Sequence, residues 1–246
     1  MFKARDAIEQ ISQWMEQQVI SAGAKGIVLG LSGGIDSAVV AYLGKKVFGD
    51  NVIGIVMPCH SLGEDAKDAM LVAEAGGIAT KTVVLDTIYD SLLTVVGDVG
   101  GDQAAAQMSR ANIKPRLRMT TLYYFAQCHN MLVAGTGNLS EKTIGYFTKH
   151  GDSGVDIMPI ADLVKGEVRE IAELLGVPRQ IIDKPPSAGL WEGQTDEDEM
   201  GLCYADLDTY IRTGVGQANV VERIERLAKN SNHKLQLPPY CQLDYS

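Results

Sequence analysis

The chain has 246 residues, of which 46% are hydrophobic and 22% are charged, and this composition suits a single α/β domain over residues 1–246. Its formal net charge of −9 disfavours nucleic acids and acidic membranes as partners, so an anionic substrate must meet a local cluster of positive charge. No apolar run reaches the roughly 20 residues of a membrane helix and the N-terminus lacks the layout of a signal peptide, so we expect a cytoplasmic protein without membrane contact. The cysteines form no C-x-x-C pair, which favours reduced, structural thiols; they are Cys59, Cys128, Cys203 and Cys241.

Short apolar runs alternate with helical patterns along the first half of the chain. The first twenty residues form an amphipathic pattern, which predicts a helix with Trp14 in the core or at a subunit interface. Strands that alternate with helices predict a parallel, doubly wound sheet with helices on both faces. The predicted strands are 26–31, 52–57, 81–85 and 131–135, and the predicted helices between them are 36–47, 65–75 and 114–127.

The second half of the chain is predicted to be mostly helical. Asp162 can cap a helix over 163–175, and Gly176 is placed to end it. Residues 182–198 are rich in Pro, Gly and polar side chains, which predicts a functional loop with a mobile lid at about 185–198. Helices are predicted over 204–212 and 217–229, before a polar tail.

The stretch LSGGIDS, which ends at Ser37, has the features of an anion site. Gly33 and Gly34 let the backbone turn tightly with its amides facing inward, and a helix beginning near Asp36 adds the positive end of its dipole. The hydroxyls of Ser32 and Ser37 add neutral donors. A phosphate group can therefore be held here largely by uncharged groups.

Two familiar glycine loops do not match this stretch. The Walker pattern requires a lysine where the chain has Ile35 and Asp36, and G-x-G-x-x-G is not met either. A carboxylate beside a polyphosphate repels it unless a cation lies between them, so Asp36 indicates bound Mg²⁺ and a metal-bound nucleotide. The alternative is that Asp36 only caps the helix that follows.

These residues resemble the S-G-G-x-D-S loop of the N-type ATP pyrophosphatases. That resemblance implies the adenine nucleotide alpha-hydrolase-like fold and cleavage of ATP between its α and β phosphates, which activates a carboxylate or carbonyl as an adenylate. GMP synthetase, asparagine synthetase and NAD synthetase belong to this superfamily. The loop implies the first half-reaction and leaves the acceptor open.

A second polar segment begins at residue 135, where a predicted strand ends in glycines and hydroxyls. Its side chains are expected at the same edge of the sheet, because ligands bind at the carboxyl ends of parallel strands. Glu141 can share a metal with Asp36, or it can be a first-turn helix glutamate that the helix dipole favours. Lys165 is predicted in the first turn of a helix, where a cation is mildly unfavourable, and such a conflict is typical of functional sites.

Four separate blocks, in order, resemble the NAD synthetase family. They are residues 135–168, the stretch NIKPRLRM at 112–119, the stretch KPPSAGLWEGQTDE at 184–197, and His233-Lys234 followed by Pro238. The resemblance implies an ammonia-dependent NAD synthetase, a ligase that converts ATP, deamido-NAD and NH₃ to AMP, diphosphate and NAD. It also implies a homodimer that binds the dinucleotide partly across its interface. The glutaminase domain of glutamine-using relatives is not expected, because one predicted helix precedes the first strand.

The same resemblance assigns residues to ligands. Asp36 and Lys165 are expected to be catalytic, Asp36 and Glu141 to bind Mg²⁺, and Trp191 to anchor its loop by apolar burial rather than stack on a base. The ATP-binding residues it implies are Gly30, Leu31, Ser32, Gly33, Gly34, Ile35, Asp36, Ser37, Thr136, Lys165 and Ser187. The deamido-NAD-binding residues it implies are Arg116, Lys149, Asp156, His233 and Lys234. The match is loose at 57–62, so adenosine contacts there stay open.

Two rival functions are weighed against this interpretation. A tRNA-modifying adenylating enzyme is expected to carry a basic strip, which a net charge of −9 disfavours. A non-catalytic nucleotide sensor on the same fold would need Asp36, Glu141 and Lys165 for binding alone.

Overall fold

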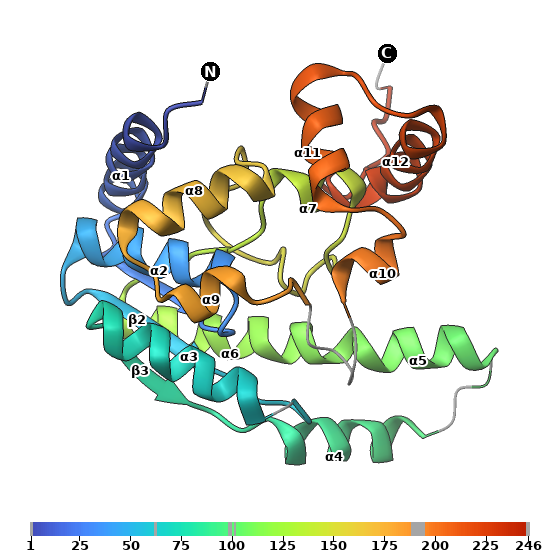
Figure 1. The fold of residues 1–246 in the computed structure, drawn as a ribbon. Helices are drawn as coiled ribbons and strands as arrows, with labels where there is room; N and C mark the ends of the chain where they lie inside the picture. The colour runs from blue at the N-terminus through green and yellow to red at the C-terminus, as the bar shows by residue number, and fades with distance from the viewer. Residues whose placement is uncertain (1, 62, 98–99, 101, 188–194, 245–246) are drawn as a thin grey trace.

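A computed structural model describes residues 2–61, 63–97, 100, 102–187 and 195–244. Within these residues a parallel sheet has the strand order β3-β2-β1-β4 (Figure 1). Its neighbouring strands all run parallel, so the predicted doubly wound sheet is confirmed. The strands are β1 (Ile27–Gly30), β2 (Val52–Val56), β3 (Ala79–Thr82) and β4 (Leu132–Val133).

Helices connect the strands and continue the chain beyond the sheet. The helices before β4 are α1 (Ala4–Ser21), α2 (Ile35–Phe48), α3 (Gly63–Gly76), α4 (Asp86–Val96), α5 (Gln103–Ala111) and α6 (Ile113–His129). The helices after β4 are α7 (Leu139–Ile144), α8 (Lys165–Leu175), α9 (Arg179–Asp183), α10 (Asp196–Met200), α11 (Tyr204–Thr213) and α12 (Ala218–Ser231), followed by the short 3₁₀ helix η1 (Asn232–Lys234).

The sheet is buried on both faces, because successive residues of a strand point to opposite sides. Ile27 and Leu29 of β1 belong to the apolar cluster formed with α1, α2, α3 and α8. Val28, between them, belongs to the cluster formed with α4 and α6. All three side chains are fully buried, and Figure 1 shows the two helical layers with the sheet between them.

A third apolar cluster joins the helices at the C-terminal end of the chain. Ile144, Leu207 and Ile224 are buried in it and come from α7, α11 and α12. Figure 1 shows these helices grouped to one side of the sheet, with α10 beneath α11. The cluster fixes α7 and α11 beside the start of α8, the region that carries Lys165.

The order of the strands places a crevice at one edge of the sheet. β1 lies between β2 and β4. The connections that follow β1 and β4 therefore run in different directions from the carboxyl ends of these two strands. The segment after β4 is held beside it, since the Gly135 amide donates to the Ile157 carbonyl at 2.8 Å. The loop after Gly30 and the segment after Val133 therefore face each other across this crevice.

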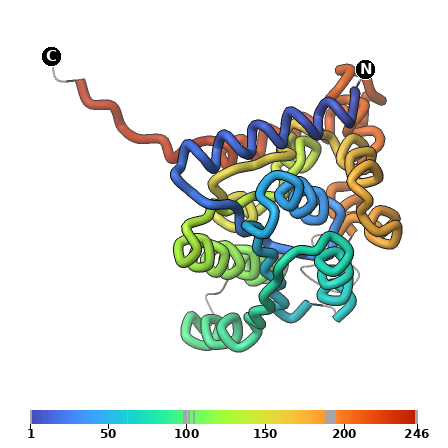
Figure 2. Tube along the Cα trace, turned by 90° about the vertical axis from the view of Figure 1, so that its left-hand side faces the viewer, coloured from blue at the N-terminus to red at the C-terminus, as the bar shows by residue number. Residues whose placement is uncertain are grey.

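The chain leaves the folded body after η1. Figure 2 shows the last described residues as an extended tail that projects from the body. The tail carries Leu237 and Tyr240, which are 90% and 80% exposed, although the sequence predicted a polar tail. Among the described residues, no helix has the length and apolarity that crossing a membrane requires.

The third strand is displaced from its predicted position. The strand was expected at 81–85, but β3 is Ala79–Thr82 and the apolar residues that follow are outside it. β3 is an edge strand whose residues are mostly exposed, so it needs no apolar side chains and has no apolar run in the sequence. Leu85, which is 1% exposed, contributes to the core from the turn before α4 instead.

Several local predictions on the helices were incomplete or wrong. Trp14 is 38% exposed on α1, so its assignment to the core is wrong and only the subunit interface stays a prediction. Asp162 does not cap α8, because Val164 is the N-cap and its amide donates to Glu167. Helices α4 and α5 were not predicted, and the loop expected over 182–198 has helical ends in α9 and α10.

Candidate active site

A cavity of about 610 Å³ opens at the carboxyl edge of the sheet. Its walls come from the loop after β1, the segment after β4, the start of α8 and the residues on both sides of 188–194. The cavity brings together most of the residues that sequence analysis had singled out. Those lining it are Gly30, Leu31, Ser32, Gly34, Ile35, Asp36, Ser37, Thr136, Glu141, Lys165, Ser187 and Lys234.

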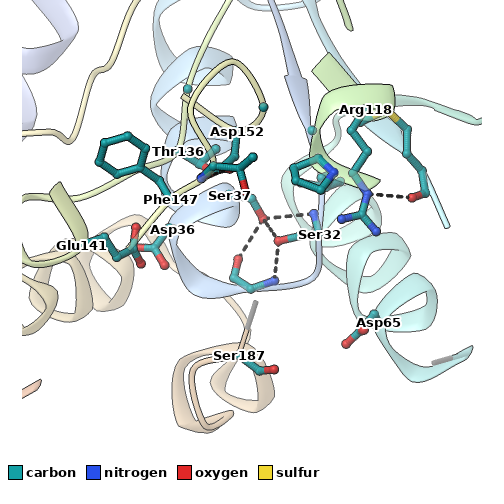
Figure 3. Close-up of a pocket in the computed structure, with 18 of the residues that line it drawn as sticks. Ser32, Asp36, Ser37, Asp65, Arg118, Thr136, Glu141, Phe147, Asp152 and Ser187 are labelled. Atoms are coloured by element: carbon teal, nitrogen blue, oxygen red, sulfur yellow. Dashed lines mark hydrogen bonds between the residues drawn. The ribbon is translucent and has the colours of Figure 1, made fainter. Parts of the chain in front are cut away.

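The loop between β1 and α2 is braced by its two serines (Figure 3). The hydroxyls of Ser32 and Ser37 lie 3.0 Å apart, and the Ser37 hydroxyl donates to the Gly34 carbonyl at 2.9 Å. The amides of Ser32 and Gly34 in turn donate to the Ser37 and Ser32 hydroxyls at 3.3 and 3.2 Å. The donors predicted for an anion are therefore assembled in one small ring of hydrogen bonds.

Gly33 is required by its backbone and by its neighbour α3. Its φ is +80°, a conformation that side chains disfavour. A Cβ at this position would lie 2.7 Å from the Asp65 carbonyl oxygen and 2.7 Å from the Asp68 Cβ. Among the described residues Gly33 does not line the cavity, so this glycine shapes the loop by allowing it to approach α3.

Asp36, Glu141 and Lys165 meet at one wall of the cavity, although they come from α2, α7 and α8. The Lys165 Nζ lies 2.6 Å from Asp36 Oδ2 and 3.4 Å from Glu141 Oε1. Figure 3 shows the two carboxylates side by side. Their side chains are only 17% exposed, and that of Lys165 is 11% exposed.

The possibility that Asp36 only caps its helix is wrong. Gly34 occupies the N-cap of α2 without any side-chain cap, and Asp36 lies inside the first turn. Its carboxylate instead accepts from Lys165 and, at 3.0 Å, from the Asn138 side-chain amide. Both partners lie about a hundred residues or more further along the chain. The Asp36 carboxylate therefore forms tertiary contacts with α8 and with the residue before α7, and does not cap its own helix.

Glu141 is a first-turn helix glutamate, as one of the two interpretations from the sequence expected, and its role as a metal ligand stays a prediction. It is the third residue of α7 and forms a capping box with Asn138, which donates its amide to Glu141 Oε2 at 3.3 Å. The other carboxylate oxygen faces Lys165. The capping box thus fixes the direction of the Glu141 side chain, and Oε1 faces Lys165 at the wall of the cavity.

Charges oppose one another in this cluster. Burial, and after it the neighbouring Asp36 carboxylate, raise the pKa of Glu141 to about 8 against the opposite effect of the Lys165 ammonium. Burial alone would lower the pKa of Lys165, but Asp36 and Glu141 outweigh it and raise that pKa above its usual value. Lys165 is therefore a fixed cation, whereas Glu141 can hold a proton at neutral pH.

The cavity as a whole is acidic. Among the described residues that line it, six are acidic and four are basic. The acidic residues are Asp36, Asp65, Glu141, Asp152, Asp196 and Glu199, and the basic ones are Arg118, Lys165, Lys184 and Lys234. The expected local surplus of positive charge is thus not found on the protein side.

Arg118 enters the cavity on the side of β2 opposite the acidic wall (Figure 3). Its Nε donates to the Met57 carbonyl at 3.1 Å and its Nη2 donates to the Ser61 hydroxyl at 3.2 Å. Sequence analysis chose Arg116 from the same stretch. The helical spacing of Pro115, Arg118 and Leu122, which all line the cavity, is the signal that identifies Arg118.

Four of the five residues predicted for the dinucleotide lie outside the cavity wall. Arg116 donates to the Lys149 carbonyl at 3.2 Å, and the Lys149 Nζ donates to the His233 carbonyl at 2.6 Å. Asp156 accepts from the Tyr123 hydroxyl and the Val133 amide. Arg116, Lys149 and His233 thus form a chain of contacts beside the tail, Asp156 is held separately next to β4, and the role of all four stays a prediction.

Lys234 is the fifth, and it reaches the cavity from the other side of that network. Its Nζ donates to the Gly145 and Phe147 carbonyls, both at 2.9 Å, and lies 5.4 Å from the centroid of the Phe147 ring. The contacts fix the segment after α7 that forms part of the wall.

The two ends of the predicted lid are joined at their base. The Asp196 amide donates to the Pro186 carbonyl at 3.1 Å. On the preceding side Lys184 forms ion pairs with Asp68 and Asp65 of α3, at 2.6 and 2.9 Å. Trp191 and the rest of 188–194 lie outside the described residues. Lys184 is half-buried, and it was missed as a contributor because its ion pairs join positions more than a hundred residues apart and so leave no local pattern.

The site can hold a magnesium ion with help from a ligand. No group of three or more His, Cys, Asp or Glu side chains with metal-binding geometry occurs among the described residues. Asp36 and Glu141 nevertheless converge on one cation, the Lys165 ammonium. Mg²⁺ commonly takes one or two carboxylates and completes its shell with water and phosphate oxygens, and this pair fits that requirement.

Comparison with known proteins places this site in one family. The chain matches the NAD synthase family model over residues 7–238. It is 50% identical over 230 residues to the NH(3)-dependent NAD(+) synthetase of Carboxydothermus hydrogenoformans, covering 94% of each chain. The archaeal NH(3)-dependent NAD(+) synthetase of Archaeoglobus fulgidus is 44% identical, covering 96% of each chain.

Solved structures share the whole fold. The NMN synthetase from Francisella tularensis superposes with a TM-score of 0.93 at 36% identity, covering 99% of this chain and 100% of that one. The NH3-dependent NAD synthetase from Campylobacter jejuni superposes with a TM-score of 0.81 at 27% identity, covering 98% and 100%.

Replacing Glu141 by Gln is expected to change how stability depends on pH. The folded pKa of about 8 exceeds the ordinary value of 4.5, so between these values the folded state holds a proton that the unfolded state has released. Stability from this group is complete below pH 4.5 and is lost as pH rises to 8. Relative to Glu141→Gln, the wild type should lose roughly 2–4 kcal/mol of unfolding free energy over this range. Urea titrations in EDTA measure it, and a constant difference between the two proteins would contradict the assignment.

Proposed function

The chain belongs to the NAD synthase family of ATP-using ligases, and we propose that it is an ammonia-dependent NAD synthetase that works as a cytoplasmic homodimer. Its reaction is ATP + deamido-NAD + NH₃ → AMP + diphosphate + NAD. The observation that carries the proposal is the meeting of Lys165, Asp36 and Glu141 beside the loop of serines and glycines. The curated relatives with this activity match nearly the whole chain.

The first half-reaction joins two anions. The nicotinate carboxylate attacks the α phosphorus of ATP, the bond to the β-phosphate oxygen breaks, and diphosphate leaves. Lys165 lies where it can neutralise charge on the α phosphate, and the amides and hydroxyls of Ser32, Gly34 and Ser37 can exchange their mutual hydrogen bonds for phosphate oxygens. Thr136 and Ser187 complete the proposed ATP site from the opposite walls.

The metal role falls to Asp36 and Glu141. When bound, Mg²⁺ supplies positive charge to the departing diphosphate and orients it. Asp36 and Glu141 would coordinate the ion through their carboxylate oxygens. Glu141 would have to lose its proton first, because a metal ligand has to be deprotonated. The acidic balance of the cavity supports this role, since polyphosphate would otherwise meet more carboxylates than cations.

In the second half-reaction neutral ammonia attacks the acyl carbon, a proton is released, and AMP leaves. Water would destroy the adenylate at this stage, so the cavity must be shielded from solvent. Pro186 and Asp196 line the cavity and are joined by a hydrogen bond, which supports a lid over about 185–198. The lid itself is a proposal.

A second candidate substrate deserves a direct test. The Francisella tularensis structure, called an NMN synthetase, superposes with a TM-score of 0.93. On this chain Arg116, Lys149, Asp156 and His233 lie outside the cavity wall. A mononucleotide with a nicotinate carboxylate is therefore the alternative acceptor, whereas deamido-NAD is supported by the greater identity of the curated relatives.

The homodimer is supported by an apolar face on α4. Ile88, Leu92, Val95 and Val96 recur at helical spacing and are 54%, 37%, 85% and 52% exposed, with Val84 just before the helix. Figure 1 shows α4 on the outer side of the molecule. A contiguous apolar face of this kind is typical of an interface, and a second copy of the chain is its proposed partner.

The purified protein is expected to convert ATP to AMP only when a nicotinate acceptor is present. With Mg²⁺, an ammonium salt and deamido-NAD it should release AMP, diphosphate and NAD in equal amounts, because the adenylate forms before the amide. The measurement is chromatography of the nucleotides. Nicotinate mononucleotide in place of deamido-NAD tests the alternative acceptor through its kcat/KM. Release of ADP, or of AMP without any acceptor, would exclude this chemistry.

Asp36→Asn is expected to reduce turnover by at least about 100-fold, since it removes the negative charge that holds the Lys165 ammonium and is proposed to hold the metal. Higher Mg²⁺ should recover part of the loss. The control is Asp50→Asn in the loop after α2, whose exposed carboxylate pairs with Lys45. Normal turnover of Asp36→Asn across a magnesium titration would exclude its proposed role.

Disrupting the α4 face should yield a monomer. The double variant Ile88→Glu/Leu92→Glu places charges on that face, and desolvating them in an interface is unfavourable. Light scattering after size exclusion should show half the wild-type mass. Leu174→Glu, at a residue 47% exposed on α8, should keep the wild-type mass. If the double variant stays dimeric, the interface lies elsewhere.

A further inference from the structure

Lys165 has a third neighbour that the proposed function does not use. Its Nζ lies 5.0 Å from the centroid of the Tyr204 ring. Tyr204 begins α11 and is 6% exposed. Among the described residues it does not line the cavity, so its ring contacts the lysine and not the space where substrates bind.

The ring is held in place by hydrogen bonds at both ends of the residue. The Tyr204 hydroxyl donates to Asp196 Oδ2 at 3.0 Å, and Asp196 is only 4% exposed. The Tyr204 amide donates to Glu197 Oε1 at 2.8 Å. The Tyr146 hydroxyl lies 3.1 Å from Asp196 Oδ1 and 2.7 Å from Glu199 Oε2, and its one proton can serve either. A buried ring fixed in this way has little freedom to move from the ammonium.

The Tyr204 ring can hold the Lys165 ammonium when the two carboxylates bind another cation. Asp36 and Glu141 hold Lys165, yet they are also the residues proposed to hold a divalent cation. A cation that takes those oxygens competes with the ammonium for them. The face of an aromatic ring attracts a cation without occupying the carboxylate oxygens, and the attraction is stronger where the pair is out of water.

We propose that Tyr204, fixed by Asp196, is a positioning residue that keeps the Lys165 ammonium directed at the transferred phosphoryl group. The inference rests on the proposed function, because it takes Lys165 to act on the α phosphate. The ring supplies the attraction and shields the lysine from water, and the hydroxyl supplies the orientation of the ring. Loss of the ring is therefore more harmful than loss of the hydroxyl.

The test compares three single variants. Tyr204→Phe keeps the ring, and Tyr204→Leu removes it while keeping an apolar side chain. The control, Tyr210→Leu, removes a ring from the same helix whose hydroxyl bonds only to Glu225 in the described structure. Thermal unfolding of each variant establishes that it folds. Steady-state assays with ATP, Mg²⁺, deamido-NAD and ammonium give kcat and the KM for ATP.

A second measurement does not depend on activity. Each protein, without nucleotide, is acylated with an amine-reactive reagent, and the rate at Lys165 is followed by peptide mass spectrometry. Tyr204→Leu should expose the amine and raise that rate about tenfold, and it should lower kcat about tenfold with a smaller change in KM, because positioning acts on the transition state. Tyr204→Phe and Tyr210→Leu should stay within about threefold of the wild type in both measurements.

The outcomes separate this inference from the proposed function. If folded Tyr204→Leu keeps the wild-type kcat and acylation rate, the ring does not position Lys165. If Tyr204→Phe and Tyr204→Leu lose kcat by the same factor, the hydroxyl is the important group and the proposed role of the ring is wrong. If the wild type forms no AMP with any nicotinate acceptor, the proposed function fails, and the acylation rates alone still decide whether Tyr204 covers Lys165.

Discussion

The ammonium of Lys165, held between the carboxylates of Asp36 and Glu141, is the interaction on which the rest of the site depends. Ion pairs this far out of water are stable only when the remaining hydrogen-bonding positions are also satisfied. Asn138 meets that requirement for both carboxylates, since its side-chain amide donates to Asp36 and its backbone amide to Glu141. The cluster therefore fixes three helices relative to one another at the mouth of the crevice.

The neighbouring elements are placed so that this cluster stays fixed. The Ser140 hydroxyl accepts from the Lys165 amide at 3.1 Å and donates to Asp208, which also accepts from the Gly166 amide at 2.8 Å. The first turn of α8 thus has its free amides satisfied by α7 and α11, which offsets the mild penalty for a lysine at that end. The C-terminal helices accordingly act as the support for the site that the sheet begins.

The part of the structure that could be predicted is the part with buried, regular patterns. Strands β1 and β2 follow from their apolar runs, the loop after β1 follows from the serines and glycines that end the first run, and the fold class follows from the alternation of strands with helices. β3 was misplaced because it is an exposed edge strand without an apolar run. α4 was missed although its apolar residues recur at helical spacing.

The site shows the same division at the level of single residues. Asp36 was found because a carboxylate in a phosphate-binding loop requires a cation, and Lys165 because a cation in the first turn of a helix is locally unfavourable. Glu141 was left open because a glutamate at its position suits both helix capping and metal binding. Arg118 was missed in favour of Arg116, although helical spacing places Arg118 on the face of Pro115 and Leu122. Tyr204 could not be found, because its role depends on a contact across 39 positions of sequence with Lys165.

The charge of the cavity explains why an acidic protein can still bind anions. Sequence analysis expected a local cluster of positive charge, yet the described lining has more acidic than basic side chains. A cavity with a surplus of lysines would hold polyphosphate without a metal, and it would hold the diphosphate product as firmly as the substrate. A divalent cation that accompanied the nucleotide would be held by Asp36 and Glu141, as proposed above, and would supply the positive charge that the described lining lacks.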